Sequence, residues 1–199
     1  MYVGRVVAVG KGKSGNNVAM YRVSSRSFPN RHIVKSDQML TVVPRPGAEH
    51  DIQKNPYIAY NAVRIDENWA VATNGTHTDP IFEKLDAGMG PRDALSTVLL
   101  ALDYEKDDYL TPRIAAVVPI IGTTGWMGIV RQDALLIREL ELITGQATYL
   151  ATYETNSIEE KNSTDFDADT ADEAAKFMID GGIFRTFEHP VTSGAALVD

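Results

Sequence analysis

Short runs of apolar and β-branched residues alternate with turn-forming residues through the first part of the chain. This pattern predicts strands over residues 3–9 and 17–23, separated by a glycine-rich turn over 10–16. The turn is superficially like a phosphate-binding loop, but it lacks the G-x-x-x-x-G-K-S/T spacing and no helical pattern follows it. We therefore predict a hairpin whose far end delivers the segment 21–31.

The next apolar runs predict three more strands. They are expected over 39–43, 57–65 and 69–73, and the last two form a hairpin turned at 66–68. Turn formers at 44–47 end the first of the three.

The pattern then changes from strands to two helices. Pro80 suits the first position of a helix over 81–87, with Thr78 or Asp79 as its cap. A second helix is predicted from Pro91 to about Asp103. Four apolar residues share one face of this second helix, at the spacing of a helix packed on a sheet: Leu95, Val98, Leu99 and Leu102.

A second group of strands follows the helices. The nearly continuous apolar run at 113–121 is typical of a buried central strand, and further strands are predicted over 125–130, 134–140 and 146–153.

The final part of the chain is more polar. Segment 154–172 is acidic and rich in Ser, Thr and Asn, so we predict a solvated loop without a site. A short helix is predicted over 171–179, ended by the glycine pair at 181–182. The tail after Phe187 carries few signals.

This order of elements defines the expected fold class. Because helices and strands are segregated, we predict an α+β fold with mainly antiparallel sheets. Two sheets stacked face to face, with helices outside, satisfy the order. No internal repeat or linker divides the chain, so one domain over residues 1–199 is expected.

Composition narrows the partners and the chemistry. The formal net charge of −8 argues against a sequence-independent nucleic-acid binder, which needs a basic face. There are no cysteines, which removes disulfides and thiolate chemistry, and the four histidines lack the spacing of a zinc site. No apolar run reaches transmembrane length and the start of the chain lacks a signal-peptide layout, so we expect a cytoplasmic protein without membrane contacts.

The segment 21–31 (YRVSSRSFPNR) is the strongest candidate for a binding site. Its three arginines, Arg22, Arg26 and Arg31, offer planar forks of N–H donors that match phosphate or carboxylate oxygens. If residues 21–26 stay extended, then Arg22, Ser24 and Arg26 share one face, and the two arginines could flank one pocket. The structural alternative is a solvated strand end and turn.

Three further segments carry polar residues in patterns that a core does not need. In 55–61, a strand would place Tyr57 and Asn61 on one face and Tyr60 on the other, either for function or for packing. In 74–78, amides at a helix start attract anions, and the alternative is plain turn and cap chemistry. In 103–109, a Glu beside a Tyr and a Lys supplies the parts for proton transfer, and the alternative is a solvated helix end.

Covalent nucleophiles are not indicated. The serines of segment 21–31 have no nucleophile-elbow context. Tyr2 is bulky and normally leaves Met1 in place, and neither residue fits an N-terminal Ser, Thr or Cys mechanism.

Taken together, these segments resemble the archaeal inosine-5′-monophosphate cyclohydrolase family. The matching motifs are YRVSSRSFPNR at 21–31, NPYIAYN at 55–61, NGTHTD at 74–79, DYEKD at 103–107 and TPRIAA at 111–116. The similarity spans at least residues 1–130. It implies a four-layer αββα fold similar to that of the N-terminal nucleophile hydrolases, without their covalent chemistry.

The resemblance also implies a reaction. It is the closure of 5-formamidoimidazole-4-carboxamide ribotide (FAICAR) to inosine 5′-monophosphate (IMP) with loss of water, the last step of purine synthesis. No metal, folate or other cofactor is required for it.

Roles for individual residues follow from laying this chemistry over the motifs. Arg22, Arg26 and Arg31 would recognise the phosphate or the formyl oxygen. The base or ribose would be bound by Asn61, Asn74, Thr76 and His77, with Ser24 beside the arginines. Tyr57, Tyr104 and Glu105, together with Arg26, are the candidates for formyl-oxygen polarisation and proton transfer.

Two other functions stay open at this stage. One is a linear-amide hydrolase on the same fold, which would need an unmasked N-terminal nucleophile. The other is a non-catalytic nucleotide-binding or shell-forming subunit, which would bind IMP without turnover. Assembly into a homo-oligomer is compatible with either.

Overall fold

The computed structural model describes residues 1–197 and contains two β-sheets. The smaller sheet runs, in spatial order, through β11 (Ser163–Asp165), β10 (Gln146–Ala151), β1 (Arg5–Lys11), β2 (Asn17–Ser24) and β12 (Pro190–Leu197). The larger runs through β3 (Arg31–Ser36), β4 (Met39–Pro44), β5 (Tyr60–Ile65), β6 (Trp69–Thr73), β7 (Arg113–Pro119), β8 (Thr124–Arg131) and β9 (Ala134–Glu141). Neighbouring strands in both sheets pair antiparallel.

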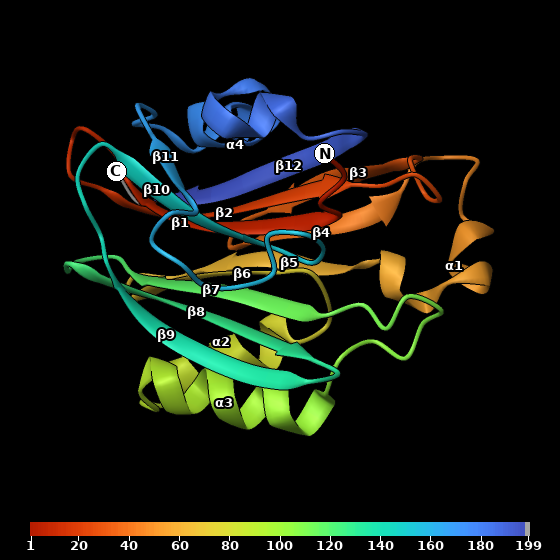
Figure 1. Cartoon of the computed structure of the whole chain (residues 1–199), viewed down its shortest axis with the longest axis horizontal. Helices are drawn as coiled ribbons and strands as arrows, with labels where there is room; N and C mark the ends of the chain where they lie inside the picture. The colour runs from red at the N-terminus through yellow and green to blue at the C-terminus, as the bar shows by residue number, and fades with distance from the viewer. Residues whose placement is uncertain (198–199) are drawn as a thin grey trace.

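The sheets stack face to face and helices cover the two outer faces (Figure 1). The helices are α1 (Asp51–Lys54), α2 (Thr78–Asp86), α3 (Pro91–Leu102) and α4 (Ala171–Asp180), with 3₁₀ turns η1 (Pro56–Ile58) and η2 (Gly182–Thr186). In Figure 1, α4 lies on the smaller sheet, while α2 and α3 lie on the larger one. The prediction of an α+β, four-layer αββα sandwich is confirmed.

Three apolar clusters hold these layers together. The first lies between the sheets, the second between the smaller sheet and α4, and the third between the larger sheet and the pair α2 and α3. In β1, Val7 and Val9 belong to the first cluster, whereas Val6 and Ala8 belong to the second. Because both faces of β1 are buried, its sequence reads as a continuous apolar run rather than an alternating one.

The hairpins and the long helices lie where the sequence predicts them. The turn at 10–16 joins β1 to β2, and β5 and β6 form the second hairpin. The predicted central strand is β7, which pairs with β6 on one side and β8 on the other. A capping box starts α4, with Thr170 accepting from the backbone of Glu173, and Gly181 follows its last turn.

Several details differ from the sequence predictions. Residues 56–58 form a 3₁₀ turn, because Pro56 starts it and Asn55 caps it by accepting from the Tyr57 backbone. Helix α2 begins at Thr78 with His77 at its cap position, not Thr78 or Asp79. Leu102 is the last residue of α3 and is 41% exposed, so it does not belong to the buried face that contains Leu95, Val98 and Leu99.

Three strands carry no clear sequence signal: β3, β11 and β12. Strand β12 is rich in small and polar residues and is stabilised by its pairing with β2 rather than by its own pattern. Among residues 1–197, no helix has both the length and the apolar character needed to cross a membrane.

Candidate active site

A pocket opens where β1 begins, β2 ends and several loops meet. Its volume is about 150 Å³. The lining residues are Tyr2, Arg5, Ser25, Arg26, Ser27, Phe28, Asn55, Asp107, Tyr109 and Tyr153. Cationic, hydroxyl and aromatic side chains therefore meet around one opening, which is the mixture that binds an anionic ligand carrying a flat ring.

Arg5 connects this pocket to a buried acidic group. Its Nη2 donates to Glu105 Oε2 at 2.9 Å, and the Glu105 side chain has no exposed surface. Burial raises the pKa of Glu105 above its ordinary value, although Arg5 and Arg113 oppose the shift. Burial also works against the charge on Arg5, but Glu105 and the nearby tyrosines outweigh it and raise the pKa of Arg5. The carboxylate is thus poised as a proton acceptor beside a permanent cation.

The loop between α3 and β7 holds Glu105 in place. Asp103 leaves the helix with a φ of 57°, and its backbone carbonyl accepts from Arg113 Nε at 2.9 Å. The Glu105 backbone N–H donates to the Thr111 carbonyl at 2.8 Å. Asp107 accepts from both the backbone and the hydroxyl of Thr111. The loop is therefore fixed by its own polar groups, as a positioned catalytic group requires.

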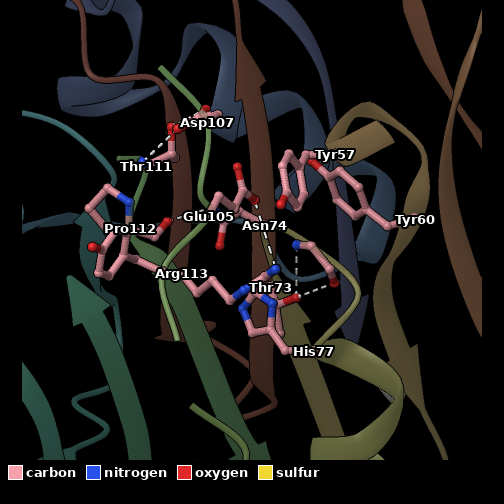
Figure 2. Close-up of polar contacts among 12 residues, drawn as sticks. Tyr57, Tyr60, Thr73, Asn74, His77, Glu105, Asp107, Thr111, Pro112 and Arg113 are labelled. Carbon is pink, nitrogen blue, oxygen red and sulfur yellow. Dashed lines mark hydrogen bonds and ion pairs between the residues drawn. The ribbon is translucent and has the colours of Figure 1, made fainter. Parts of the chain in front are cut away.

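Arg113 and His77 lie next to Glu105 from two other elements (Figure 2). Arg113 Nη1 is 3.9 Å from Glu105 Oε1. His77 Nε2 is 2.9 Å from the Ile114 carbonyl, and because a carbonyl only accepts, Nε2 carries the hydrogen. Burial and the Arg113 charge lower the pKa of His77 to about 3, so the imidazole is neutral at physiological pH.

Buried polar atoms without a hydrogen-bond partner gather in this region. Across residues 1–197 nine such side-chain atoms occur, and five belong to this cluster: Arg5 Nε, Arg31 Nη1, His77 Nδ1, Glu105 Oε1 and Arg113 Nη1. Unpaired buried polar atoms are costly and rare, so their concentration marks a place built to receive polar ligand atoms.

Two tyrosines form the inner boundary of the cluster. The Tyr21 and Tyr60 hydroxyls are hydrogen-bonded between the sheets. Burial, together with Tyr60, raises the pKa of Tyr21 well above its ordinary value, while Arg5 and Arg31 oppose the shift. Arg31 is buried, donates through Nε to the Phe28 carbonyl, and leaves Nη1 unpaired.

The structure brings several of the sequence-predicted residues together. Arg26 lines the pocket and lies over the Tyr2 ring at 4.2 Å. Glu105 and His77 belong to the buried cluster, and the Tyr57 ring lies 5.7 Å from the Arg113 guanidinium. Arg31 approaches from β3.

The structure corrects the prediction that Arg22 and Ser24 lie at the pocket. Arg22 shares a face with Ser24, to whose hydroxyl its Nε donates, but this face packs under α4 rather than on the pocket. Its remaining N–H groups donate to the carbonyls of Met178, Ile179, Phe184 and Phe187. Strand β2 ends at Ser24, so Arg26 leaves that face, and the two arginines do not flank one pocket.

Asn61 also lies away from the pocket lining, and the prediction that Tyr57 and Asn61 share one face of a strand is wrong. Because residues 56–58 are a 3₁₀ turn, the alternation starts only at Tyr60. Asn61 donates to both carboxylate oxygens of Asp79 in α2 and accepts from the Thr41 hydroxyl. It thus connects the larger sheet to α2.

Three further predicted site residues do not line the pocket: Asn74, Thr76 and Tyr104. Asn74 is fully buried and joins the end of β6 to β7 through the Pro112 carbonyl and the Ile114 N–H. Thr76 is exposed. The Tyr104 ring lies under Lys106 Nζ at 3.3 Å, and Tyr104 is not among the residues lining the pocket.

Sequence reasoning missed Arg5, Arg113 and Tyr153. A signal existed for the two arginines, because each begins an otherwise apolar buried strand where a charge needs a partner. Tyr153 had no such signal. Its hydroxyl contacts that of Thr111 at 2.8 Å, a pairing between residues distant in sequence.

Other hollows of the described chain differ from this pocket, and the one of about 300 Å³ beside α4 is lined mainly by carboxylates, Asp167, Glu173 and Asp180, with Lys176. Within the described part of the chain, no group of three or more His, Asp and Glu side chains could hold a metal ion. A groove of about 160 Å³ lies between the β3–β4 turn and the C-terminal end of β12. Its lining includes the apolar residues Leu40, Val63 and Ile65.

Comparison with known proteins identifies relatives of the whole chain. Residues 2–199 match the family model described as IMP cyclohydrolase-like protein. An IMP cyclohydrolase of Methanosphaera stadtmanae is 46% identical over 98% of this chain and 94% of its own length. The IMP cyclohydrolase of Methanocaldococcus jannaschii is 44% identical over 100% of this chain and 95% of its own length. The IMP cyclohydrolase of Halobacterium salinarum is 49% identical over 96% of this chain and 89% of its own length.

Proposed function

The chain belongs to the IMP cyclohydrolase family, and on this premise we propose how its pocket closes FAICAR to IMP. The chain is an enzyme of purine biosynthesis, with a nucleotide substrate and a nucleotide product. The pocket and the buried cluster beneath it supply the groups that this ring closure needs.

One observation carries the proposal: Arg5 and Glu105 form a buried ion pair that reaches the floor of an aromatic pocket. Around it, positive groups exceed negative ones, since the four arginines Arg5, Arg26, Arg31 and Arg113 face the three carboxylates Glu105, Asp107 and Glu188. A nucleotide monophosphate restores the balance, and the excess positive charge attracts it to the pocket.

The reaction is an intramolecular condensation. The carboxamide nitrogen attacks the formyl carbon, a C–N bond forms, and the formyl oxygen becomes an oxyanion. This oxygen then leaves as water, with one proton from the carboxamide nitrogen and one from the formamido nitrogen. The formyl carbon is already on the substrate, so no oxidant and no one-carbon donor is consumed. The protein has to hold the reactive conformer, stabilise the oxyanion and move protons.

The substrate's phosphate is assigned to the rim of the pocket. Arg26, Ser25 and Ser27 lie there in one short segment, and charge-assisted hydrogen bonds to phosphate are strong. Tyr2, Tyr109 and Tyr153 offer aromatic surface for the imidazole ring.

The reacting atoms are assigned to the floor. The Arg5 guanidinium stabilises the formyl oxyanion, and Glu105 accepts a proton from the attacking nitrogen. Tyr57, above Arg113, is the hydroxyl that we propose as a further donor to the formyl oxygen. We propose Tyr57 rather than Tyr104 for this role, because the Tyr104 ring packs against Lys106, whereas the Tyr57 ring lies near Arg113 of the buried cluster.

A continuous ultraviolet assay with FAICAR tests the proposal. Purified protein without added metal or folate is expected to produce IMP, and Glu105→Gln is expected to lower kcat while IMP still binds. Tight binding of IMP without turnover would support a binding subunit instead. Cleavage of linear amides without ring closure would support the amide-hydrolase alternative.

Self-assembly and a cytoplasmic location stay predictions, as does the absence of nucleic-acid and membrane partners. Size-exclusion chromatography with light scattering tests the first. Gel-shift and vesicle-flotation assays test the partners.

A further inference from the structure

Three of the unpaired buried atoms surround a single glycine. A β-carbon on Gly75 would lie 2.8 Å from Arg113 Nη1, 3.2 Å from His77 Nδ1 and 3.4 Å from Glu105 Oε1. Any side chain at this position would therefore occupy the space between the three atoms. Gly75 itself is buried, and its backbone φ does not lie in the left-handed region. The backbone conformation therefore does not require a glycine at this position, whereas the lack of room for a side chain does.

The three atoms have a definite hydrogen-bonding character. Arg113 Nη1 can only donate. Glu105 Oε1 accepts, and its partner oxygen Oε2 is already bonded to Arg5. His77 Nδ1 also accepts, because Nε2 carries the hydrogen that is donated to the Ile114 carbonyl. The set is one donor and two acceptors.

The distance between two of these atoms is informative. Arg113 Nη1 and Glu105 Oε1 are 3.9 Å apart, which is too far for a direct hydrogen bond and suitable for a bridging group. The bridging group must be small, because Glu105 and His77 are almost completely buried.

We propose that Arg113, Glu105 and His77 bind one buried water molecule against Gly75. A water molecule accepts one hydrogen bond and donates two, which complements this set. Buried waters typically make about three hydrogen bonds to otherwise unsatisfied groups. The water gives each of the three atoms a partner, so that none is left with the cost of an unmade hydrogen bond.

The site has a consequence for catalysis, which rests on the proposed function. The water donates to Glu105 Oε1 while Arg5 donates to Oε2, so both carboxylate oxygens are satisfied in the ionised form that accepts the substrate proton. The charged and titratable groups facing Glu105 are Arg5 from β1, Arg113 from β7, Asp107 from its own loop and His77 from the start of α2. Gly75 and His77 are thus positioning residues for Glu105.

A crystal structure of the wild-type protein at about 1.5 Å resolution tests the site directly. The expected result is density for one water within about 2.6–3.3 Å of all three atoms. An empty space, or an Arg113 side chain that closes directly onto Glu105, would overturn the proposal. This outcome is independent of turnover: the water could be absent in an enzyme that converts FAICAR, or present in a protein that does not.

Gly75→Ala tests the consequence, because its methyl group would crowd the same three atoms and leave no room for the water between them. We expect kcat to fall about tenfold or more, the KM for FAICAR to stay within about threefold, and the acid limb of the kcat–pH profile to move to higher pH. Gly128→Ala is the matched control, since its β-carbon would also meet a side-chain atom at 2.8 Å, but on the α3 side of the larger sheet. Unchanged kcat and pH profile in Gly75→Ala would contradict the proposal.

His77 provides a second pair of variants in case Gly75→Ala folds poorly. His77→Asn keeps a polar atom near the Nδ1 position, whereas His77→Gln keeps one near Nε2 and removes the acceptor for the water. Only His77→Gln is expected to shift the acid limb and to lose the water density. Equal pH profiles in the two folded variants would speak against the water.

Discussion

Two regions of this protein bury arginine side chains, and they do so in opposite ways. Under α4, Arg22 is fully buried, and its N–H groups are used by Ser24 and by backbone carbonyls near the end of the helix. Beneath the pocket, Arg5 and Arg113 each keep a buried nitrogen without a partner. The hydrogen-bonding groups of the first arginine are satisfied within the protein, whereas the second region needs the proposed water and atoms of a bound ligand as further partners.

The electrostatics of the two regions differ as well. Burial lowers the pKa of Arg22 to about 10, with no carboxylate to offset it. Its charge lies at the C-terminal end of α4, where a cation stabilises a helix. The pKa of Arg5 is instead raised, by Glu105 and nearby tyrosines. Burial of an arginine therefore does not by itself indicate a ligand site; unsatisfied donors beside an open pocket do.

Glu105→Gln gives the largest expected effect on the pocket side of the comparison. It removes the proton acceptor while keeping the shape, so we expect kcat to fall about 10²–10³-fold. Stability is expected to fall as well, because the substitution leaves the largely buried Arg5 cation without its carboxylate partner. Stopped-flow or steady-state turnover and thermal unfolding measure the two quantities. A variant with near wild-type kcat would remove Glu105 from the mechanism.

Arg22→Met tests the other region. The methionine fills part of the space but leaves several buried carbonyls without donors, so the free energy of unfolding is expected to drop by about 3 kcal/mol. The kcat of the folded enzyme should stay within about twofold, since the pocket is not touched. Urea denaturation measures the free energy of unfolding, and kcat is measured at a temperature where the variant is folded. A large loss of kcat with little loss of stability would restore the original prediction for Arg22.

His77 links stability to pH. Its pKa is about 3 in the folded protein against 6.5 in the unfolded chain, so it contributes stability above pH 6.5 that is lost as the pH falls towards 3. Between pH 7.5 and pH 5 this loss is expected to reach about 2 kcal/mol. Glu105 and other groups titrate as well, and a comparison at both pH values with His77→Asn, which is expected to leave the acid limb unchanged, isolates the histidine. An equal pH dependence in the two proteins would contradict the assignment.

Arg26→Gln gives the smallest effect in this series. Arg26 is 57% exposed and pairs with Glu188 at the rim, so its contact with phosphate is partly screened by solvent. We expect the KM for FAICAR to rise about tenfold, with kcat within about threefold. The increase in KM should become smaller at high salt. A KM that changes neither with the substitution nor with salt would show that Arg26 does not bind the phosphate.

Most of the fold could be predicted because its strands and helices are locally encoded. The strand over 113–121 and the helix after Pro91 follow from apolar runs and from proline and glycine signals, which depend on neighbours in sequence. Strands β3 and β12 could not be predicted in this way. Their sequences form strands because β4 and β2 offer free edges to pair with.

The candidate site could be predicted only in part. The motifs marked loops that meet at the pocket and the buried cluster, and Glu105, His77 and Arg26 were singled out because no structural need for polar residues could be read from the sequence there. Arg22 and Asn61 were misplaced because the sequence does not say which face of a strand meets α4 or α2. Arg5 was missed because its partner lies 100 positions away.

The sequence by itself thus determined the α+β class, the family and the segments that carry chemistry, since these depend on residue types and on short-range spacing. Only the tertiary structure decided which polar groups are satisfied and which are not. That distinction depends on the stacking of two sheets, which brings β1, the α3–β7 loop and the start of α2 to one place. Hydrogen bonds reach about 3 Å, so they can be assigned only once distant segments have been placed that close together.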